Sequence, residues 1–177
     1  MNKLKKILAP TDLSELSRAG VRYALEMAAP GETEVIVYNV MGYYEAMPYY
    51  ELEGGYVPYQ DIPTAEEVVE EHRRHLAEFL RDNFGELTRR VKVRQEVAIG
   101  TPYHKIVEKA AAENADIIIM STHGRTGFLH TLIGSVTEKV VRLAACPVLT
   151  VRPQIEAAPN EPSPDGSRRK RKASALS

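Results

Sequence analysis

Glycine and hydroxyl residues gather in one stretch, Asp116 to Lys139, which reads DIIIMSTHGRTGFLHTLIGSVTEK. The apolar residues 117–120 predict a strand covered on both faces, as is usual in parallel sheets. Gly124, Gly127 and Gly134 follow it, and glycines permit backbone conformations that other residues resist and let main-chain N–H groups approach a ligand closely. A strand, a glycine loop and a helix start in this order favour an anion site, with phosphate as the candidate ligand.

The predicted helix after Gly134 provides the donors for such an anion. The N–H groups of Ser135, Val136 and Thr137 have no partner within a helix, and the helix dipole adds roughly half a positive charge at that end. The Ser135 hydroxyl can add a donor, and Arg125 can add a mobile positive charge. The alternative is that these glycines only form tight turns. Their position between a buried strand and a helix favours the anion site.

Two other segments are expected at the same edge of the sheet. Asp12 follows a strand predicted over residues 4–9, and its carboxylate can accept hydrogen bonds from an adenine amino group or a ribose hydroxyl. Asp12 can also cap the next helix together with Ser14, which is a natural N-cap, and the two roles do not exclude each other. Val40 ends the strand predicted over 34–40, and its backbone can bond a base edge. Because ligands of open parallel sheets sit beyond the carboxyl ends of the strands, these segments together predict a nucleotide site.

Hydrophobic periodicity predicts one doubly wound α/β domain over residues 1–152, with a five-stranded parallel sheet and helices on both faces. A length of 177 residues suits one domain with a tail. The predicted strands span 4–9, 34–40, 91–99, 116–120 and 148–152. Four helices are predicted. The first follows Ser14, and the second runs from a capping box at Thr64 and Glu67 to about Asn83, with Gly85 as its stop. The third begins at Thr101 and ends at Asn114, and the fourth begins after Gly134.

The bulk composition and the absent motifs exclude several classes of function. With 23 basic and 24 acidic residues the net charge is −1, which gives no argument for nucleic acid or an anionic membrane. The single cysteine, Cys146, fits a reducing cytoplasm, and no apolar run approaches the ~20 residues of a membrane span. The sequence lacks the phosphate loop of P-loop hydrolases, G-x-x-x-x-G-K-[ST], and the dinucleotide-binding pattern G-x-G-x-x-G after the first strand. It also lacks the nucleophile elbow G-x-S-x-G. We therefore predict a cytoplasmic protein without membrane contact, catalytic residues or a metal cluster of its own.

Two segments depart from the α/β pattern. Residues 41–63 hold six of the nine tyrosines, and this segment is either a surface loop packed on the domain or a contact surface for another protein. Residues 153–177 lose all periodicity and end in a basic run, RRKRK at 168–172. We predict a disordered basic tail there, for which nucleic-acid binding is a weaker interpretation than solubility.

The sequence resembles the universal stress protein domain family over residues 1–152. The likeness rests on KKILAPTDLSE near the start, STHGRTGFLHTLIGSVTEKVV and the final CPVLTVR. The ATP-binding branch of that family carries a glycine, two residues, a glycine, nine residues, and a glycine followed by serine or threonine. Gly124, the nine residues after it, and Gly134 with Ser135 match this pattern. Ser121 stands where the family has its first glycine.

The resemblance implies a fold like that of the adenine nucleotide alpha hydrolases and a site for ATP with Mg²⁺ or Mn²⁺. By resemblance, Asp12 and Val40 hold adenine, Ser121 meets the ribose, and the later residues surround the triphosphate. His123 lies beside this loop, as a brace for it or as a phosphate contact. The predicted nucleotide contacts are Pro10, Thr11, Asp12, Val40, Ser121, His123, Gly124, Arg125, Gly134, Ser135, Val136 and Thr137.

The resemblance further implies a homodimer formed through the last strand, Val148–Arg152. The leading hypothesis is an ATP-binding stress-response protein that signals, or holds a protein partner, according to nucleotide occupancy, with little or no hydrolysis. One alternative is a nucleotide-independent interaction module of the same fold. Another is a slow ATPase or phosphotransferase.

Overall fold

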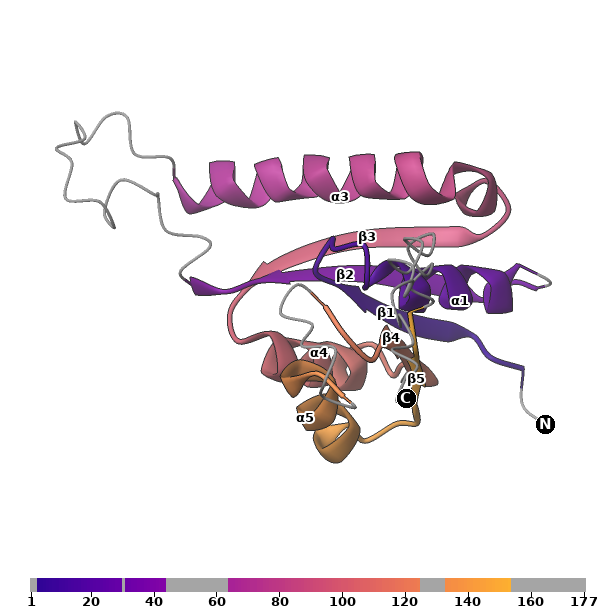
Figure 1. Ribbon diagram of the computed structural model, residues 1–177. Helices are drawn as coiled ribbons and strands as arrows, with labels where there is room; N and C mark the ends of the chain where they lie inside the picture. Colours follow the sequence, from indigo (N-terminus) through magenta and orange to yellow (C-terminus); the bar gives the residue numbers. More distant parts are fainter. Residues whose placement is uncertain (1–2, 30, 44–63, 125–132, 154–177) are drawn as a thin grey trace, which may run out of the picture.

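A computed structural model of the chain describes residues 3–29, 31–43, 64–124 and 133–153 (Figure 1). The tyrosine-rich segment beyond Tyr43, the loop residues Arg125 and Gly127, and the basic tail from residue 154 lie outside the described residues. The elements are β1 (Lys6–Thr11), α1 (Arg18–Ala28), β2 (Glu34–Met41), α3 (Ala65–Thr88), β3 (Lys92–Ile99), α4 (Pro102–Ala112), β4 (Ile117–Ser121), α5 (Ser135–Leu143) and β5 (Val148–Val151).

The strands form one parallel sheet in the order β3-β2-β1-β4-β5. β1 lies at the centre, and the chain adds strands first on one side of it and later on the other. The strand order therefore reverses between β1 and β4, which is where open α/β sheets bind ligands. The predicted doubly wound α/β fold with five parallel strands is confirmed. None of the helices in the described ranges combines the length and apolar character needed to cross a membrane.

The core consists of two layers, one on each face of the sheet (Figure 1). Ile7 and Ala9 of β1 pack with α1 and α3, whereas Leu8 between them packs with α4 and α5. All three side chains are fully buried. A strand buried on both faces needs apolar residues at successive positions, which explains the continuous apolar runs in β1 and β4.

Two helix boundaries differ from the sequence prediction. α1 begins at Arg18, because residues 13–17 form turns, and the Ser14 hydroxyl accepts a bond from the Ser17 N–H at 3.2 Å instead of capping a longer helix. α3 does not stop at Gly85 but continues to Thr88 across a kink at Phe84, where φ is −141°. Its predicted N-terminal capping box is present.

Gly20 lets α1 approach the end of β4 more closely than any other residue would allow. A Cβ at this position would lie 2.6 Å from the Ser121 nitrogen and 2.7 Å from the Met120 carbonyl carbon. Backbone atoms cannot turn away as a flexible side chain can, so the helix and the strand would have to separate.

We therefore expect Gly20→Ala to lower the free energy of unfolding by about 2–3 kcal/mol, as overpacked cores do. Gly85→Ala is the matched control, because it also lies in a helix and a Cβ there meets nothing within 4 Å. That control should gain about 0.5–1 kcal/mol through helix propensity. Urea unfolding of both variants measures the difference, and equal stabilities would contradict the packing argument.

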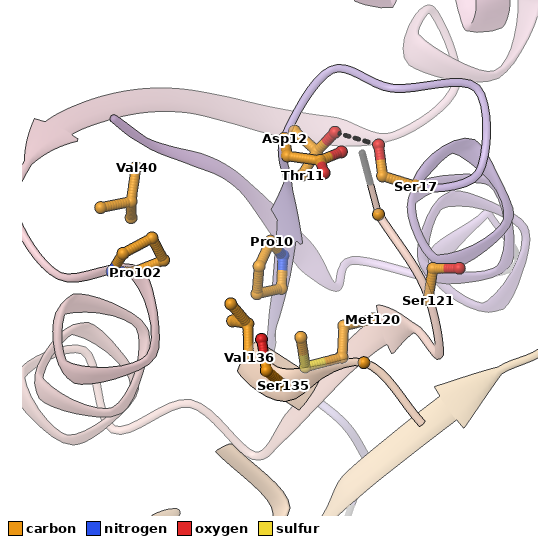
Figure 2. A pocket seen from close by; sticks show the side chains of 12 residues that line it. Pro10, Thr11, Asp12, Ser17, Val40, Pro102, Met120, Ser121, Ser135 and Val136 are labelled. Carbon is orange, nitrogen blue, oxygen red and sulfur yellow. Dashed lines mark hydrogen bonds between the residues drawn. The ribbon is translucent and has the colours of Figure 1, made fainter. Parts of the chain in front are cut away.

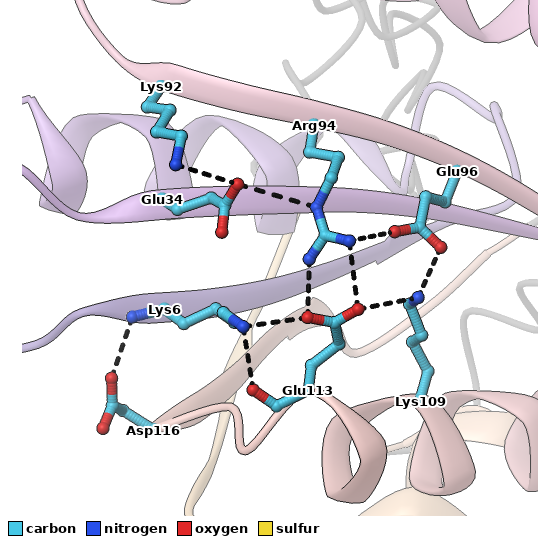
Figure 3. Close-up of polar contacts among 8 residues, drawn as sticks. All are labelled: Lys6, Glu34, Lys92, Arg94, Glu96, Lys109, Glu113 and Asp116. Carbon is cyan, nitrogen blue, oxygen red and sulfur yellow. Dashed lines mark hydrogen bonds and ion pairs between the residues drawn. The ribbon is translucent and has the colours of Figure 1, made fainter.

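An ionic cluster lies at the opposite, amino-terminal edge of the sheet (Figure 3). At its centre the Glu113 carboxylate, at the end of α4, accepts hydrogen bonds from Arg94 at 2.6 and 3.0 Å, Lys6 at 2.8 Å and Lys109 at 3.0 Å. These three cations, Arg94 foremost, hold the pKa of Glu113 well below its usual range. The cluster thereby joins β1, β3 and α4.

Glu113 should make the fold sensitive to acid. Because its folded pKa lies below the unfolded value of about 4.3, the stabilisation is present above that value and is lost as pH falls toward the folded pKa. We expect Glu113→Gln to lower the free energy of unfolding at pH 7 by about 1–2 kcal/mol, within the range for hydrogen bonds to charged groups. Below about pH 5 the stability of this variant should decline less steeply than that of the parent protein. Urea titrations at several pH values measure this. Glu78→Gln, at an exposed position of α3, is the control and should follow the parent curve.

Candidate functional site

A cavity of about 250 Å³ opens at the carboxyl edge of the sheet, where the strand order reverses (Figure 2). It is bounded by the ends of β1, β2 and β4 and by the first turns of α4 and α5. Its lining residues are Pro10, Thr11, Asp12, Ser17, Val40, Pro102, Met120, Ser121, Gly124, Gly134, Ser135 and Val136.

The cavity brings together most of the predicted nucleotide contacts from three separate parts of the sequence. Of the remaining ones, Thr137 and His123 do not line it, and Arg125 lies outside the described residues. Thr137 is buried and its hydroxyl donates to the Ser121 carbonyl at 3.0 Å, so its side chain fastens α5 to β4. The His123 ring lies 2.9 Å from the Thr122 hydroxyl, as in a loop brace.

One part of the cavity wall is apolar. Val40 and Pro102 lie together at one side of the cavity, with Pro10 and Val136 between them and Met120 (Figure 2). These side chains offer no hydrogen bonds and present flat or branched hydrocarbon surface. Such a wall suits a planar ring that is bonded along its edge, because the faces of the ring are then removed from water.

The opposite part of the wall depends on a close approach between Asp12 and Gly124. A Cβ on Gly124 would lie 2.2 Å from Asp12 Oδ2, so a larger residue would displace the carboxylate. Gly134 is similarly tight, since a Cβ there would lie 3.1 Å from the Thr122 carbonyl oxygen. Among the described glycines, positive φ occurs at Gly100, whereas Gly134 has φ of −68°. Because φ is not positive at Gly124 or Gly134, these two glycines are required for space and not for a left-handed backbone.

The N-terminus of α5 faces the same cavity. Gly134 is its N-cap and no side chain caps it; the first helical bond runs from the Glu138 N–H to the Gly134 carbonyl at 2.9 Å. The N–H groups of residues 135–137 therefore precede the first intrahelical bond, and the positive end of the helix dipole lies at Ser135, which lines the cavity. This geometry can hold an anion.

A strained turn holds Asp12. Asp12 Oδ1 accepts bonds from the Ser14 N–H at 3.0 Å and from the Ser14 hydroxyl at 2.6 Å. Leu13 between them has φ of 64°, a left-handed conformation that costs a leucine about 1–2 kcal/mol. The other described non-glycine residue with positive φ is Asn114, a type that tolerates it. Asp12 thus caps a turn that ends before α1, and the prediction that Asp12 and Ser14 cap the helix itself is wrong, because the N-cap of α1 is Ser17.

Sequence reasoning missed Ser17, Pro102 and Met120. Two of them carried a usable signal, since Met120 ends the apolar run of β4 and Pro102 opens the helix that follows β3, at the predicted ligand edge. Ser17 carried none, because the prediction started α1 too early and placed Ser17 inside a helix.

The chain is a doubly wound α/β protein whose cavity, at the strand-order reversal, combines an apolar wall, a carboxylate and a helix N-terminus. The sequence model of the Universal stress protein family matches residues 3–152. The chain belongs to this family, so the resemblance inferred from the motifs is confirmed.

Three relatives illustrate the similarity. Universal stress protein MJ0531 of Methanocaldococcus jannaschii is 33% identical over 155 residues, covering 85% of this chain and 84% of the relative. The solved structure of hypothetical protein MJ0577, from the same organism, is 30% identical with a TM-score of 0.67, covering 86% of this chain and 98% of that one. A universal stress protein in complex with cAMP is 20% identical with a TM-score of 0.60, covering 85% and 98%, and shares the fold.

The contact between Asp12 and Gly124 can be tested by a double-mutant cycle. We expect Gly124→Ala to cost about 1–2 kcal/mol of unfolding free energy, because its methyl group meets the Asp12 carboxylate. In an Asp12→Ala background the same substitution should cost close to nothing, since the obstructing group is gone. Urea unfolding of the four proteins measures the coupling.

Gly134→Ala is the control for this cycle, because its methyl group would meet backbone, the Thr122 carbonyl, instead of Asp12. Its cost should be the same in both backgrounds. If Asp12→Ala relieved both glycine substitutions, or neither, the proposed contact would be refuted.

Proposed function

We propose that this universal stress protein binds ATP in the cavity at the carboxyl edge of the sheet and signals by its nucleotide occupancy. The observation that carries the proposal is that one cavity has an apolar wall, the Asp12 carboxylate and the N-terminus of α5 around it. An adenine nucleotide has three parts that match these features in the same order: a flat base, a hydroxylated sugar and an anionic phosphate chain. A related structure with cAMP supports an adenine nucleotide as the ligand.

In this arrangement the base lies against the apolar wall beside Val40 and Pro102. Asp12 accepts hydrogen bonds from the base amino group or the ribose, and Ser121 lies near the sugar. The phosphates approach Gly124, Gly134 and the N-terminus of α5, where small residues leave room and the dipole is favourable.

A divalent ion, Mg²⁺ or Mn²⁺, would arrive with the phosphates. No group of three or more His, Cys, Asp or Glu side chains converges on a metal position within the described ranges. Such an ion would be held mainly by phosphate oxygens and water, and the Ser135 hydroxyl in the cavity wall could supply a protein oxygen. The ion would neutralise phosphate charge.

The proposal includes little or no hydrolysis. Asp12 is the ionisable residue in the described cavity wall, and one of its oxygens is already bonded twice to Ser14. A general base must reach the attacking water, and Asp12 is assigned here to the base or the sugar instead. Occupancy, and not turnover, would then be the signal.

Measurement of ADP release over hours tests this, and sustained release far above the uncatalysed rate would contradict it.

We also propose a cytoplasmic homodimer joined through β5. β5 is an edge strand with part-exposed residues, and Val141 and Leu143 of the preceding helix are about half exposed. Pairing of this edge with a second copy would bury it. Sedimentation equilibrium should give twice the chain mass, and a monomer at tens of micromolar would contradict the assignment.

ATP binding is tested by calorimetry with Mg²⁺. We expect Asp12→Ala to weaken ATP affinity about 10- to 100-fold, the range for a hydrogen bond to a charged group, and Gly134→Val to abolish measurable binding by filling the phosphate cradle. Asp82→Ala removes an exposed aspartate on α3 and is the matched control, with unchanged affinity expected.

Unchanged affinity in both site variants would refute the site assignment. Failure of the parent protein to bind ATP, and absence of nucleotide in the purified protein, would instead favour the nucleotide-independent interaction module.

A further inference from the structure

A buried polar residue outside the cavity wall is bonded to Thr11, the residue before Asp12. Asn39, on β2, is 2% exposed and is in register with Thr11 at the end of β1. Its side-chain Nδ2 donates to the Thr11 carbonyl at 2.9 Å. The last peptide group before Asp12 is thus fixed by a side chain from the neighbouring strand.

From Thr11 a network of hydrogen bonds among hydroxyl and main-chain groups continues through Ser17 and Ser14 to the Asp12 carboxylate. The Ser17 hydroxyl donates to the Ser14 carbonyl at 2.8 Å, so its single proton is used and the 2.8 Å bond between Thr11 and Ser17 must have Thr11 as donor. Thr11 Oγ1 in turn accepts from the Leu13 N–H at 3.0 Å.

These bonds hold both sides of the strained Leu13. Its own N–H is bonded to Thr11, and the Ser14 hydroxyl, which accepts from the Ser17 N–H, donates to Asp12 Oδ1. The left-handed turn and the orientation of the carboxylate are therefore one bonded unit. Its anchor outside the turn is Asn39.

The amide of Asn39 is itself incompletely satisfied. Within the part of the chain that the structure describes, Asn39 Oδ1 is buried and has no hydrogen-bond partner. A buried polar atom without a partner is unfavourable, and a leucine of similar size would avoid it. The buried amide is therefore unfavourable if it serves packing alone, which indicates that it helps to position the adjacent residues of the site.

We propose that Asn39 is a positioning residue for nucleotide binding. It fixes the Thr11 carbonyl, and through the Thr11–Ser17 bond and the Leu13 turn it orients the Asp12 carboxylate before the ligand arrives. The inference rests on the proposed function, because the benefit of a fixed carboxylate is a smaller ordering cost on binding. Asn39 acts through Asp12 and makes no contact with the ligand itself.

The test is a double-mutant cycle on the full chain, with the affinity for Mg²⁺-ATP measured by calorimetry. Asn39→Leu should weaken binding about 5- to 20-fold in the parent protein. In an Asp12→Ala background it should cause less than a 2-fold further change, because the group that it positions is absent. An unchanged affinity in the parent protein, or the same loss in both backgrounds, would overturn the inference.

Thr33→Val controls for a general loss of buried polar bonds. Thr33 is also buried, and its hydroxyl donates to the Leu4 carbonyl at 2.8 Å, before β2 at the amino edge of the sheet. We expect lower stability but unchanged ATP affinity. Were Thr33→Val to weaken binding as much as Asn39→Leu, the effect would be structural and the inference would fail.

Two outcomes separate the inference from the proposed function. If the parent protein does not bind ATP, the proposed function fails and the inference fails with it. If the parent binds ATP and Asn39→Leu binds equally well, the inference alone fails. Asn39→Ala, which removes the amide without adding a branched side chain, decides the question in the same cycle if Asn39→Leu does not fold.

Discussion

The site depends on the position of β1 at the centre of a parallel sheet. Because β1 has β2 on one side and β4 on the other, the chain leaves the carboxyl ends of β1 and β4 toward opposite faces of the sheet. No connection can cover both, so a hollow remains between them. The polar residues of the cavity come from the strand ends and the turns that follow them, and the apolar interior of the sheet lies beneath.

Much of this could be predicted from the sequence, since each strand is a run of apolar residues with a helical pattern beyond it. The cavity residues at strand ends were accessible for the same reason: a parallel sheet places Asp12, Val40 and Ser121 at one edge. The features that escaped depend on distances between segments far apart in sequence. The contact of Gly124 with Asp12 and of Gly20 with β4 is invisible in a pattern, because any glycine looks alike in a sequence.

The errors at the two helix ends have different physical causes. Ser14 is a good N-cap by residue type, yet Asp12 competes for its N–H and hydroxyl and draws it into a turn. Gly85 is a good helix stop, yet α3 packs on the sheet on both sides of the kink, and Phe84 remains buried while the helix continues. At Ser14 the competing carboxylate is only two residues away, whereas at Gly85 the helix is maintained by packing on the sheet, which a short sequence window does not contain.

The ionic cluster around Glu113 gives the molecule two ends with different sensitivities. Glu113 lies at the amino edge of the sheet and the cavity at the carboxyl edge, and the cluster and the cavity share β1 and α4 but no side chain. A ligand that binds the folded chain adds to its stability by mass action, irrespective of where protons act. The pH at which the chain unfolds in acid should therefore fall as the cavity fills, and this pH reports on occupancy.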